Sequence, residues 1–261
     1  MQTPAVEMNG DAAASWVLRV PDSSPNRLRL LCLPHAGSGA SWYSSWANRL
    51  GSDVDVVPLQ PPGRESRIGE SAFSCMNELV DALYAAVLPL CRHPYSVFGH
   101  SMGSHVAFEL VRRLRDAAMD LPVCLIVSGA RAPHLAAARP CLFELGDDAL
   151  LAAIESRYGA CFEPEIRELV RLTMPTLRAD LQLVETQVHR AGTPLPVPML
   201  VLAGASDASV PLADARQWER HTSETFEFKL FPGGHFFPMT QREAVLGCIA
   251  RRIANHGVPV R

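Results

Sequence analysis

Six short apolar runs alternate along the chain with segments of helical periodicity, and this alternation restricts the fold more than any other feature. The runs lack strict apolar–polar alternation and end at turn residues, as strands buried on both faces of a parallel sheet do. Alternating strands and helices predict an α/β fold with a mostly parallel central sheet flanked by helices. The predicted strands are 28–33, 54–59, 95–98, 124–128, 199–203 and 226–231, and the clearest helices are 76–90 and 101–115.

One connection is longer than the fold requires. About 68 residues separate the strand that ends near Ala130 from the one that begins at Met199, whereas a whole βαβ unit takes roughly 30 or more. The surplus has helical character at 147–159 and 163–190, and Pro175 should break or kink the second segment. We expect a helical insertion at about 131–196 that forms a lid over the carboxyl ends of the strands, where open α/β sheets bind ligands. The alternative is a pair of helices that only cover the sheet.

The strongest local signal is the sequence GHSMG at 99–103, which follows an apolar strand and precedes a helical segment. G-x-S-x-G in this strand–turn–helix context indicates a nucleophile elbow and narrows the fold class to the α/β-hydrolase fold. The turn leaves no room for side chains at Gly99 and Gly103, and the helix N-terminus favours a developing oxyanion. Ser101 is therefore the candidate nucleophile; the alternative is an ordinary serine in a glycine-rich turn.

A serine hydroxyl needs a base, and the base needs an acid that orients it. The fold predicts the chain order Ser, Asp or Glu, His, with the last two on loops after late strands. Asp207 in GASDASV and His235 in PGGHFFP fit this order and these positions. The alternatives are a turn aspartate that caps the next helix and a solvated loop histidine. Weaker competitors lie in helical segments, near helix ends or within the elbow: Asp180, Asp214, His221, His256 and His100.

Attack on a carbonyl also needs donors for the oxyanion, which are usually backbone N–H groups. One should be Met102, the residue after the nucleophile, and the other should come from the loop after the first strand, PHAGSG at 34–39. Small residues let that backbone approach the substrate, and we predict Ala36 as the donor. The alternative for this loop is a plain glycine-rich turn.

Composition limits the remaining possibilities. The 261 residues are 48% hydrophobic and carry a net charge of −3, which suits a single α/β domain at 15–261 and gives no reason to expect nucleic acid as a partner. Residues 1–14 are small and polar and should form a flexible tail. The seven cysteines are irregularly spaced, without a CxxC pair or metal-ligand spacing. They indicate buried thiols in a reducing compartment and no metal site.

The N-terminal residues have neither the basic start nor the apolar core of a signal peptide. No stretch approaches the roughly 20 apolar residues that span a bilayer. These features predict a cytoplasmic protein without a membrane partner.

Five segments taken together resemble the type II thioesterases of polyketide and nonribosomal peptide assembly lines. They are LPHAGSGASWY, LQPPGRESRIGE, VFGHSMGSHVAFEL, LRADLQLVET and FPGGHFFP, and the resemblance runs in order from about Trp16 to the C-terminal helix. GHSMG occurs in many α/β-hydrolases, whereas the combination of PHAG, PGRE, LRAD and GGHFF is far more specific. Two departures concern the acyl pocket: Ser38 stands where PHAGG is more common, and no aromatic residue occurs near 186–187.

The resemblance implies an editing enzyme that removes acyl groups from the phosphopantetheine arm of acyl or peptidyl carrier proteins. It implies Ser101 as nucleophile, His235 as base and Asp207 as acid. It also implies Ala36 and Met102 as oxyanion donors and the insertion as lid. The carrier proteins or domains are the expected partners, the protein itself needs no cofactor because the substrate carries phosphopantetheine, and a monomer is expected.

Three other functions remain open from the sequence. A general carboxylesterase or lipase has the same three residues but lacks support from the PGRE and LRAD segments. A chain-releasing thioesterase usually forms the last domain of a megasynthase, whereas we expect this chain to be free-standing. A catalytically silent carrier-binding protein of the same fold is disfavoured because all five expected positions are present.

Overall fold

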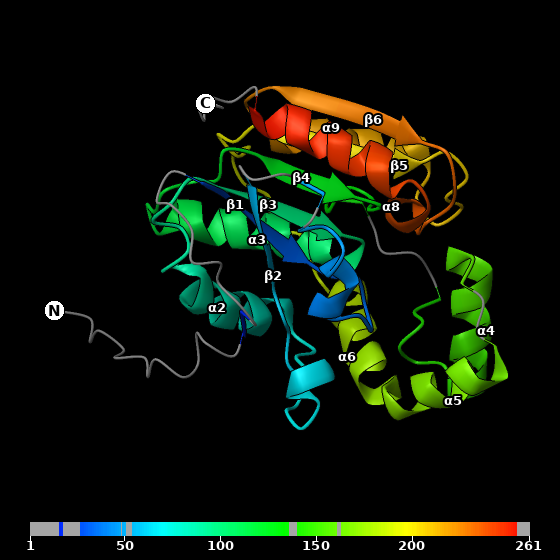
Figure 1. The fold of residues 1–261 in the computed structure, drawn as a ribbon. Coiled ribbons are helices and arrows are strands. Elements are labelled where there is room, and N and C mark those ends of the chain that lie inside the picture. Colours follow the sequence, from blue (N-terminus) through cyan, green and yellow to red (C-terminus); the bar gives the residue numbers. More distant parts are fainter. Residues whose placement is uncertain are drawn as a thin grey trace, which may run out of the picture.

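A six-stranded parallel sheet forms the centre of the molecule (Figure 1). The computed structural model describes residues 16–17, 27–47, 49–50, 54–135, 140–160 and 163–254, with the backbone alone at 164–166; the tail predicted at 1–14 lies outside them. The strands are β1 (Leu28–Leu33), β2 (Val54–Pro58), β3 (Tyr95–His100), β4 (Leu125–Ser128), β5 (Met199–Gly204) and β6 (Phe226–Phe231). They pair in the order β2-β1-β3-β4-β5-β6, and every neighbouring pair is parallel. The predicted α/β fold class is confirmed.

Every predicted strand is present, and the differences are confined to strand ends. β3 continues two residues further than predicted because Gly99 and His100 pair with β4. β2 stops one residue early, and Leu59 instead forms an antiparallel bridge with Val17. Partners that are distant in the chain therefore decide where these strands end.

Helices cover both faces of the sheet, and alternate strand residues supply the two cores. In β1, Leu31 and Leu33 face one core, while Leu30 and Cys32 face the other. The covering helices are α2 (Met76–Val87) and α3 (Met102–Asp116) on the first face and α8 (Phe237–Thr240) and α9 (Arg242–Ala254) on the second. Short helices lie in the connections: η1 (Ala40–Tyr43), η2 (Glu65–Arg67), α7 (Leu212–Arg216) and η3 (Gln217–His221). Each fully buried leucine contributes about 1.5–3 kcal/mol, so the strands form a rigid support for the loops at their ends.

The described part of the long connection between β4 and β5 contains three helices, α4 (Asp147–Tyr158), α5 (Pro164–Leu172) and α6 (Met174–Glu185). The predicted break at Pro175 is present, and this proline lies in the first turn of α6, where its missing N–H has no helical partner to lose. The inserted helices stand beyond the carboxyl ends of the strands (Figure 1). α4 and α6 share a separate apolar cluster with the segment before α4, and Val170 of α5 packs against it. Its buried members are Leu142, Leu150, Leu151, Ile154, Met174, Leu177 and Leu181.

The strand order contains a topological switch point between β1 and β3. The chain adds β2 on one side of β1 and all later strands on the other. Ligands of open α/β sheets bind at the carboxyl ends of the strands at such a point. The loop 34–38 follows β1 and Ser101 follows β3, so the fold brings these two segments to the position where a ligand is expected.

The prediction of buried thiols is right for most described cysteines and wrong for one. The buried ones are Cys32, Cys91, Cys124, Cys141 and Cys248. Cys75 is exposed because it occupies the N-cap of α2, before the helix turns its apolar face to the sheet. Cys161 lies outside the described residues.

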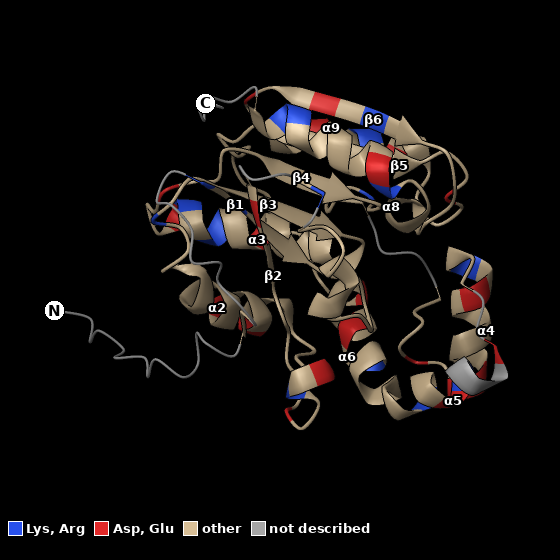
Figure 2. Ribbon diagram, viewed as in Figure 1, with Lys and Arg blue, Asp and Glu red and all other residues tan. Residues whose placement is uncertain are grey.

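The surface carries both signs of charge. Acidic and basic residues are interspersed along the ribbon in the view of Figure 2, in keeping with a net charge of −3. Within the described ranges, every helix falls short of the length and apolar character needed to cross a membrane.

Candidate active site

Ser101 forms a tight turn between β3 and α3. Its φ of 54° and ψ of −116° lie outside the regions that residues with a side chain ordinarily adopt. A Cβ atom on Gly99 would lie 2.1 Å from the carbonyl oxygen of Gly103, and one on Gly103 would lie 2.2 Å from the carbonyl oxygen of Leu33. Only glycine therefore fits on either side of the serine. This is the elbow geometry that the G-x-S-x-G pattern predicts.

The structure brings the three predicted residues of the site together. His235 follows β6, and its Nε2 lies 2.9 Å from the hydroxyl oxygen of Ser101. Asp207 follows β5, and its Oδ2 lies 2.8 Å from Nδ1 of His235. Asp207 and His235 are both buried. Three side chains from separate loops thus form one continuous hydrogen-bonded row.

The partners of His235 define which of its nitrogens can act as a base. A carboxylate only accepts hydrogen bonds, so Nδ1 carries the proton and Nε2 of the neutral ring accepts from the serine hydroxyl. Burial alone would raise the pKa of Asp207, but the hydrogen bond and charge of His235 and two bonds from Ser209 outweigh it and lower that pKa. Asp207 is therefore ionised at neutral pH. The row can take the proton from Ser101 and so activate the hydroxyl as a nucleophile.

Ser209 is a fourth member of the site that the sequence reasoning missed. Its hydroxyl donates to Oδ1 of Asp207 at 2.6 Å, and its backbone N–H donates to the same oxygen at 2.9 Å. The hydroxyl oxygen also lies 3.1 Å from Nδ1 of His235. Asp207 is thus a turn aspartate and the partner of His235 at once, through different oxygens. The spacing of an Asx turn could have indicated Ser209, since aspartate often accepts from the residue two positions on.

The two predicted oxyanion donors lie beside Ser101. Ala36 and Met102 line the same cavity as the serine hydroxyl. Met102 is the first residue of α3, where backbone N–H groups have no intrahelical acceptor. The carbonyl oxygen of Ala36 accepts from Nδ1 of His35 at 2.9 Å, and burial lowers the pKa of His35 to about 4, so this ring is neutral at pH 7.

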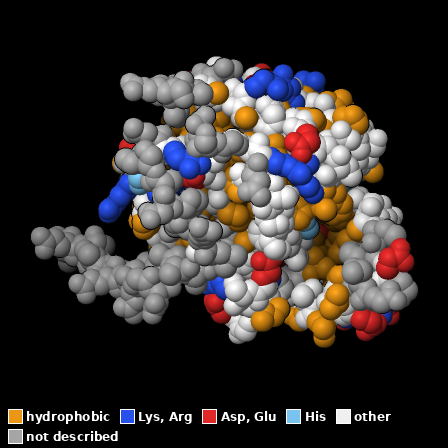
Figure 3. All heavy atoms as spheres, in the orientation of Figure 1, with side chains coloured by type: hydrophobic (Ala, Val, Ile, Leu, Met, Phe, Trp, Pro, Cys, Tyr) orange, Lys and Arg blue, Asp and Glu red, His pale blue; other side chains and the backbone are white. Residues whose placement is uncertain are grey.

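Two cavities of different character meet at the serine. Figure 3 shows hydrophobic side chains gathered in the hollow beside the inserted helices. One has a volume of about 210 Å³ and is mainly apolar, with Ile154, Leu177 and Leu181 in its wall. The other has a volume of about 140 Å³ and includes the polar side chains of Arg131, Arg157 and Gln187. The walls that they share are Ser101, Met102, Tyr158, Val184, Glu185 and His235.

Tyr158 and Glu185 place the inserted helices in direct contact with the site. The ring of Tyr158, at the end of α4, lies 4.7 Å from the ring of His235, and burial raises the pKa of its phenol. The carboxylate of Glu185, at the end of α6, accepts the backbone N–H groups of Leu142 and Phe143 at 2.8 and 3.1 Å. Neither residue was predicted, because the helical pattern does not show where the helices pack.

The competing candidates bond to residues other than Ser101, although the ring of His100 lies 5.1 Å from the ring of His235. They pair as Asp180 with Arg64, Asp214 with Arg131, His221 with His134 and His100 with Ser128. His256 lies outside the described residues. Among the residues that the structure describes, no group of three or more His, Cys, Asp or Glu side chains is placed to hold a metal ion.

Proteins of one kind resemble the chain over most of its length. A family model described as a thioesterase domain matches residues 28–253. Thioesterase PikA5 of Streptomyces venezuelae is 38% identical over 248 residues, which cover 94% of this chain and 88% of that protein. The gramicidin S biosynthesis protein GrsT of Aneurinibacillus migulanus is 31% identical over 226 residues, 85% of this chain and 87% of that protein.

Solved structures show the same likeness in three dimensions. The type II thioesterase BorB from the borrelidin biosynthetic cluster superposes with a TM-score of 0.84 at 35% identity. The match covers 92% of this chain and 98% of that one. The similarity therefore includes both the sheet and the inserted helices.

Proposed function

The chain belongs to the thioesterase family, and on that basis we propose that it hydrolyses acyl thioesters on the phosphopantetheine arm of acyl or peptidyl carrier proteins. In this role it acts as a cytoplasmic type II thioesterase that removes stray or stalled acyl groups from a polyketide or nonribosomal peptide assembly line. One observation carries the proposal: the hydrogen-bonded row from Asp207 through His235 to Ser101 ends where two cavities meet. The names of GrsT and BorB, which refer to gramicidin S and borrelidin biosynthesis, support the pathway class.

In the proposed first half-reaction, the oxygen of Ser101 bonds to the thioester carbonyl carbon as its proton passes to Nε2 of His235. The carbonyl electrons move to oxygen, and the N–H groups of Ala36 and Met102 stabilise the resulting oxyanion. Losing one such donor typically costs about 2.7–4 kcal/mol of transition-state stabilisation. When the carbonyl re-forms, the carbon–sulfur bond breaks and the pantetheine sulfur leaves with the proton that His235 held.

The second half-reaction releases the acid. His235 takes a proton from water, the hydroxide oxygen bonds to the acyl carbon, and the Ser101 oxygen leaves and regains its proton. A thiolate leaves more readily than an alkoxide, so the acyl-enzyme forms without a strong acid beside the leaving group. The scheme needs no metal and no cofactor apart from the phosphopantetheine of the substrate.

The two cavities divide the substrate between them. The apolar cavity receives the acyl group, because its wall is built from aliphatic side chains of α4 and α6. The second cavity, which has both polar and apolar walls, receives the end of the phosphopantetheine arm, whose amides need hydrogen-bonding partners such as Gln187. The inserted helices then act as the lid, since α4 and α6 form walls of both cavities.

A comparison of three substrates with one acyl group tests the function. Butyryl groups are presented on a phosphopantetheinylated carrier protein, on a small thiol and on an oxygen ester. We expect kcat/KM to fall at least about tenfold from the loaded carrier to the small thioester, and by the same factor again from the small thioester to the oxygen ester. Each tenfold fall corresponds to about 1.4 kcal/mol. An oxygen ester that is hydrolysed as fast as the loaded carrier would identify a general carboxylesterase, and a cyclic product from a long acyl chain would identify a releasing enzyme.

The apolar cavity should also reject acyl groups that carry a negative charge. Glu185 is a carboxylate in its wall, and its ion pair with Arg157 at 3.7 Å leaves that arginine in the neighbouring cavity. No Lys or Arg among the described residues lines the apolar cavity itself, and His35 is neutral at pH 7. Burying an unpaired carboxylate in such a place is costly. We expect succinyl-loaded carrier to be hydrolysed at least about tenfold more slowly than butyryl-loaded carrier, which has the same chain length. Glu185→Gln should narrow the difference between the two substrates. If the wild-type enzyme hydrolyses succinyl- and butyryl-loaded carrier at equal rates, the apolar cavity is not the acyl site.

A further inference from the structure

Arg64 and Asp180 form a buried ion pair that the proposed chemistry leaves without a role. Nη1 of Arg64 lies 2.5 Å from Oδ2 of Asp180, and Nη2 lies 2.8 Å from Oδ1. Both side chains are 4% exposed. Burying such a pair gives little stability, because desolvation of the two charges offsets their attraction. A pair kept in this position therefore suggests a role other than stability.

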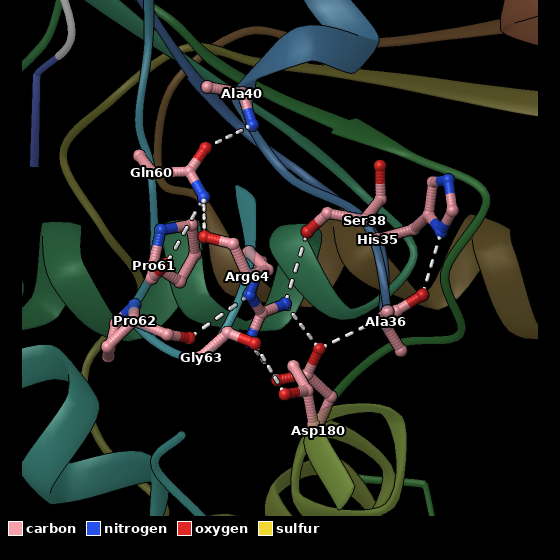
Figure 4. A network of polar contacts seen from close by, with 12 residues as sticks. His35, Ala36, Ser38, Ala40, Gln60, Pro61, Pro62, Gly63, Arg64 and Asp180 are labelled. Atoms are coloured by element: carbon pink, nitrogen blue, oxygen red, sulfur yellow. Dashed lines mark hydrogen bonds and ion pairs between the residues drawn. The ribbon is translucent and has the colours of Figure 1, made fainter. Parts of the chain in front are cut away.

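The pair holds the loop that follows β1 from two sides (Figure 4). The backbone N–H of Gly37 donates to Oδ2 of Asp180 at 2.8 Å, and Arg64 Nη1 donates to the carbonyl oxygen of Ser38 at 3.1 Å. Gly37 has a φ of 75°, a left-handed conformation that favours glycine. These bonds fix the peptide groups immediately after Ala36.

The loop at 60–64 and helix α6 are held in the same network. Gln60 accepts the backbone N–H of Ala40 at 2.8 Å and donates to the carbonyl oxygen of Arg64 at 2.9 Å. The hydroxyl of Thr176 donates to the carbonyl oxygen of Gly63 at 2.6 Å. Three segments that are remote in sequence, PHAG, PGRE and LRAD, thus meet at one carboxylate.

We propose that Arg64 and Asp180 are positioning residues that hold the backbone N–H of Ala36 in line with the oxyanion formed at Ser101. The inference rests on the proposed function, in which Ala36 is a donor. Asp180 fixes the N–H of the next residue, and His35 fixes the carbonyl oxygen of Ala36 at 2.9 Å. The peptide plane between Ala36 and Gly37 is therefore held at both of its polar atoms. The pair acts through this loop and touches neither the substrate nor the triad side chains.

Asp180→Asn tests the proposal with little change of shape. The amide NH₂ of asparagine replaces one of the two carboxylate oxygens, which accept from Arg64 and from the N–H of Gly37. Whichever oxygen is lost, the NH₂ group then faces at least one other donor. We expect kcat for butyryl-loaded carrier to fall about 10- to 100-fold, less than the about 10²–10³-fold loss that follows removal of a whole donor. KM should change less than about threefold, because the cavities remain. Asp147→Asn is the matched control, since it removes an Arg–Asp pair between α4 and α6 that does not contact the loop (Arg178 Nη2 to Asp147 Oδ1, 2.7 Å).

A carrier-free measurement separates positioning from a general structural role. An aliphatic trifluoromethyl ketone accepts the Ser101 oxygen at its carbonyl carbon and becomes an oxyanion, whereas the corresponding alcohol fills the cavity without one. In Asp180→Asn, the inhibition constant of the ketone should rise by the factor by which kcat falls, and that of the alcohol should stay constant. Equal weakening of both ligands, or no weakening of the ketone, overturns the proposal.

Arg64→Lys provides a second variant in case Asp180→Asn does not fold. It keeps the charge but cannot hold Asp180 in a bidentate pair, and we expect a smaller loss of ketone affinity, about three- to tenfold, in the same direction. Unchanged ketone affinity in this folded variant overturns the proposal as well. If the wild type binds the ketone tightly but does not release acyl groups from a carrier, the proposed function fails and the positioning role stands.

Discussion

Ser101→Ala is expected to lower the rate of acyl release from a loaded carrier by about 10⁴-fold or more. The hydroxyl oxygen is the atom that bonds to the acyl carbon, and alanine offers no replacement. In serine hydrolases, loss of the nucleophile costs up to about 10⁶ in kcat, and the residual rate comes from the oxyanion donors and from binding. The rate is measured as free acid formed from butyryl-loaded carrier under single-turnover conditions.

The variant should bind its substrate as the wild type does. The turn at Ser101 is held by the glycines on either side and by β3 and α3, none of which needs the hydroxyl. Ser156→Ala, at an exposed position of α4, is the matched control and should keep the wild-type rate. A residual rate within tenfold of the wild type in Ser101→Ala would remove Ser101 from the reaction.

Asp207→Asn should lower kcat by about 10³- to 10⁴-fold, the second largest effect expected. The carboxylate holds the proton of His235 on Nδ1 and leaves Nε2 free to accept from Ser101. An asparagine can donate its NH₂ to Nδ1, which places the proton on Nε2, where it blocks the transfer from the serine. In serine proteases the equivalent exchange leaves the geometry intact and costs about 10⁴ in kcat.

The measurement for Asp207→Asn is kcat for butyryl-loaded carrier, together with the thermal unfolding midpoint. Asp214→Asn serves as control, because Asp214 follows the same strand but pairs with Arg131 at 2.7 Å. Only Asp207→Asn should lose activity by orders of magnitude while staying folded. Comparable losses in both variants would show that the effect is structural and would remove Asp207 from its assigned role.

The parts of the site that the sequence predicts are those that local rules determine. Gly99 and Gly103 lie so close to neighbouring backbone that no side chain fits at either position. The elbow can therefore be predicted from its local sequence, without knowledge of the rest of the fold. Asp207 and His235 each follow a buried strand, and parallel strands bring their carboxyl ends to one edge of the sheet. The switch point between β1 and β3, which brings Ala36 and Ser101 to one cavity, was not predicted, because it depends on the spatial order of the strands.

The parts that the sequence does not predict depend on contacts between distant segments. Asp180 lies in a helical segment and looks like an ordinary surface acid, yet it is buried against Arg64, which is 116 positions away. Tyr158 reaches His235 only because α4 folds back over the strand ends, which no periodicity indicates. The apolar surroundings of most cysteines predict burial correctly, whereas Cys75 is exposed because it stands at the N-cap position of α2, ahead of the helix's buried face.

The central claim is that the hydroxyl of Ser101, activated by the neighbouring imidazole, is the nucleophile of a hydrolase. Covalent labelling with a fluorophosphonate, followed by intact-mass measurement and peptide mapping, tests it most directly. A single phosphonyl group is expected on Ser101 in the wild type and in Ser156→Ala, and none in Ser101→Ala. An unlabelled wild type, or a label on another residue that persists in Ser101→Ala, would contradict it.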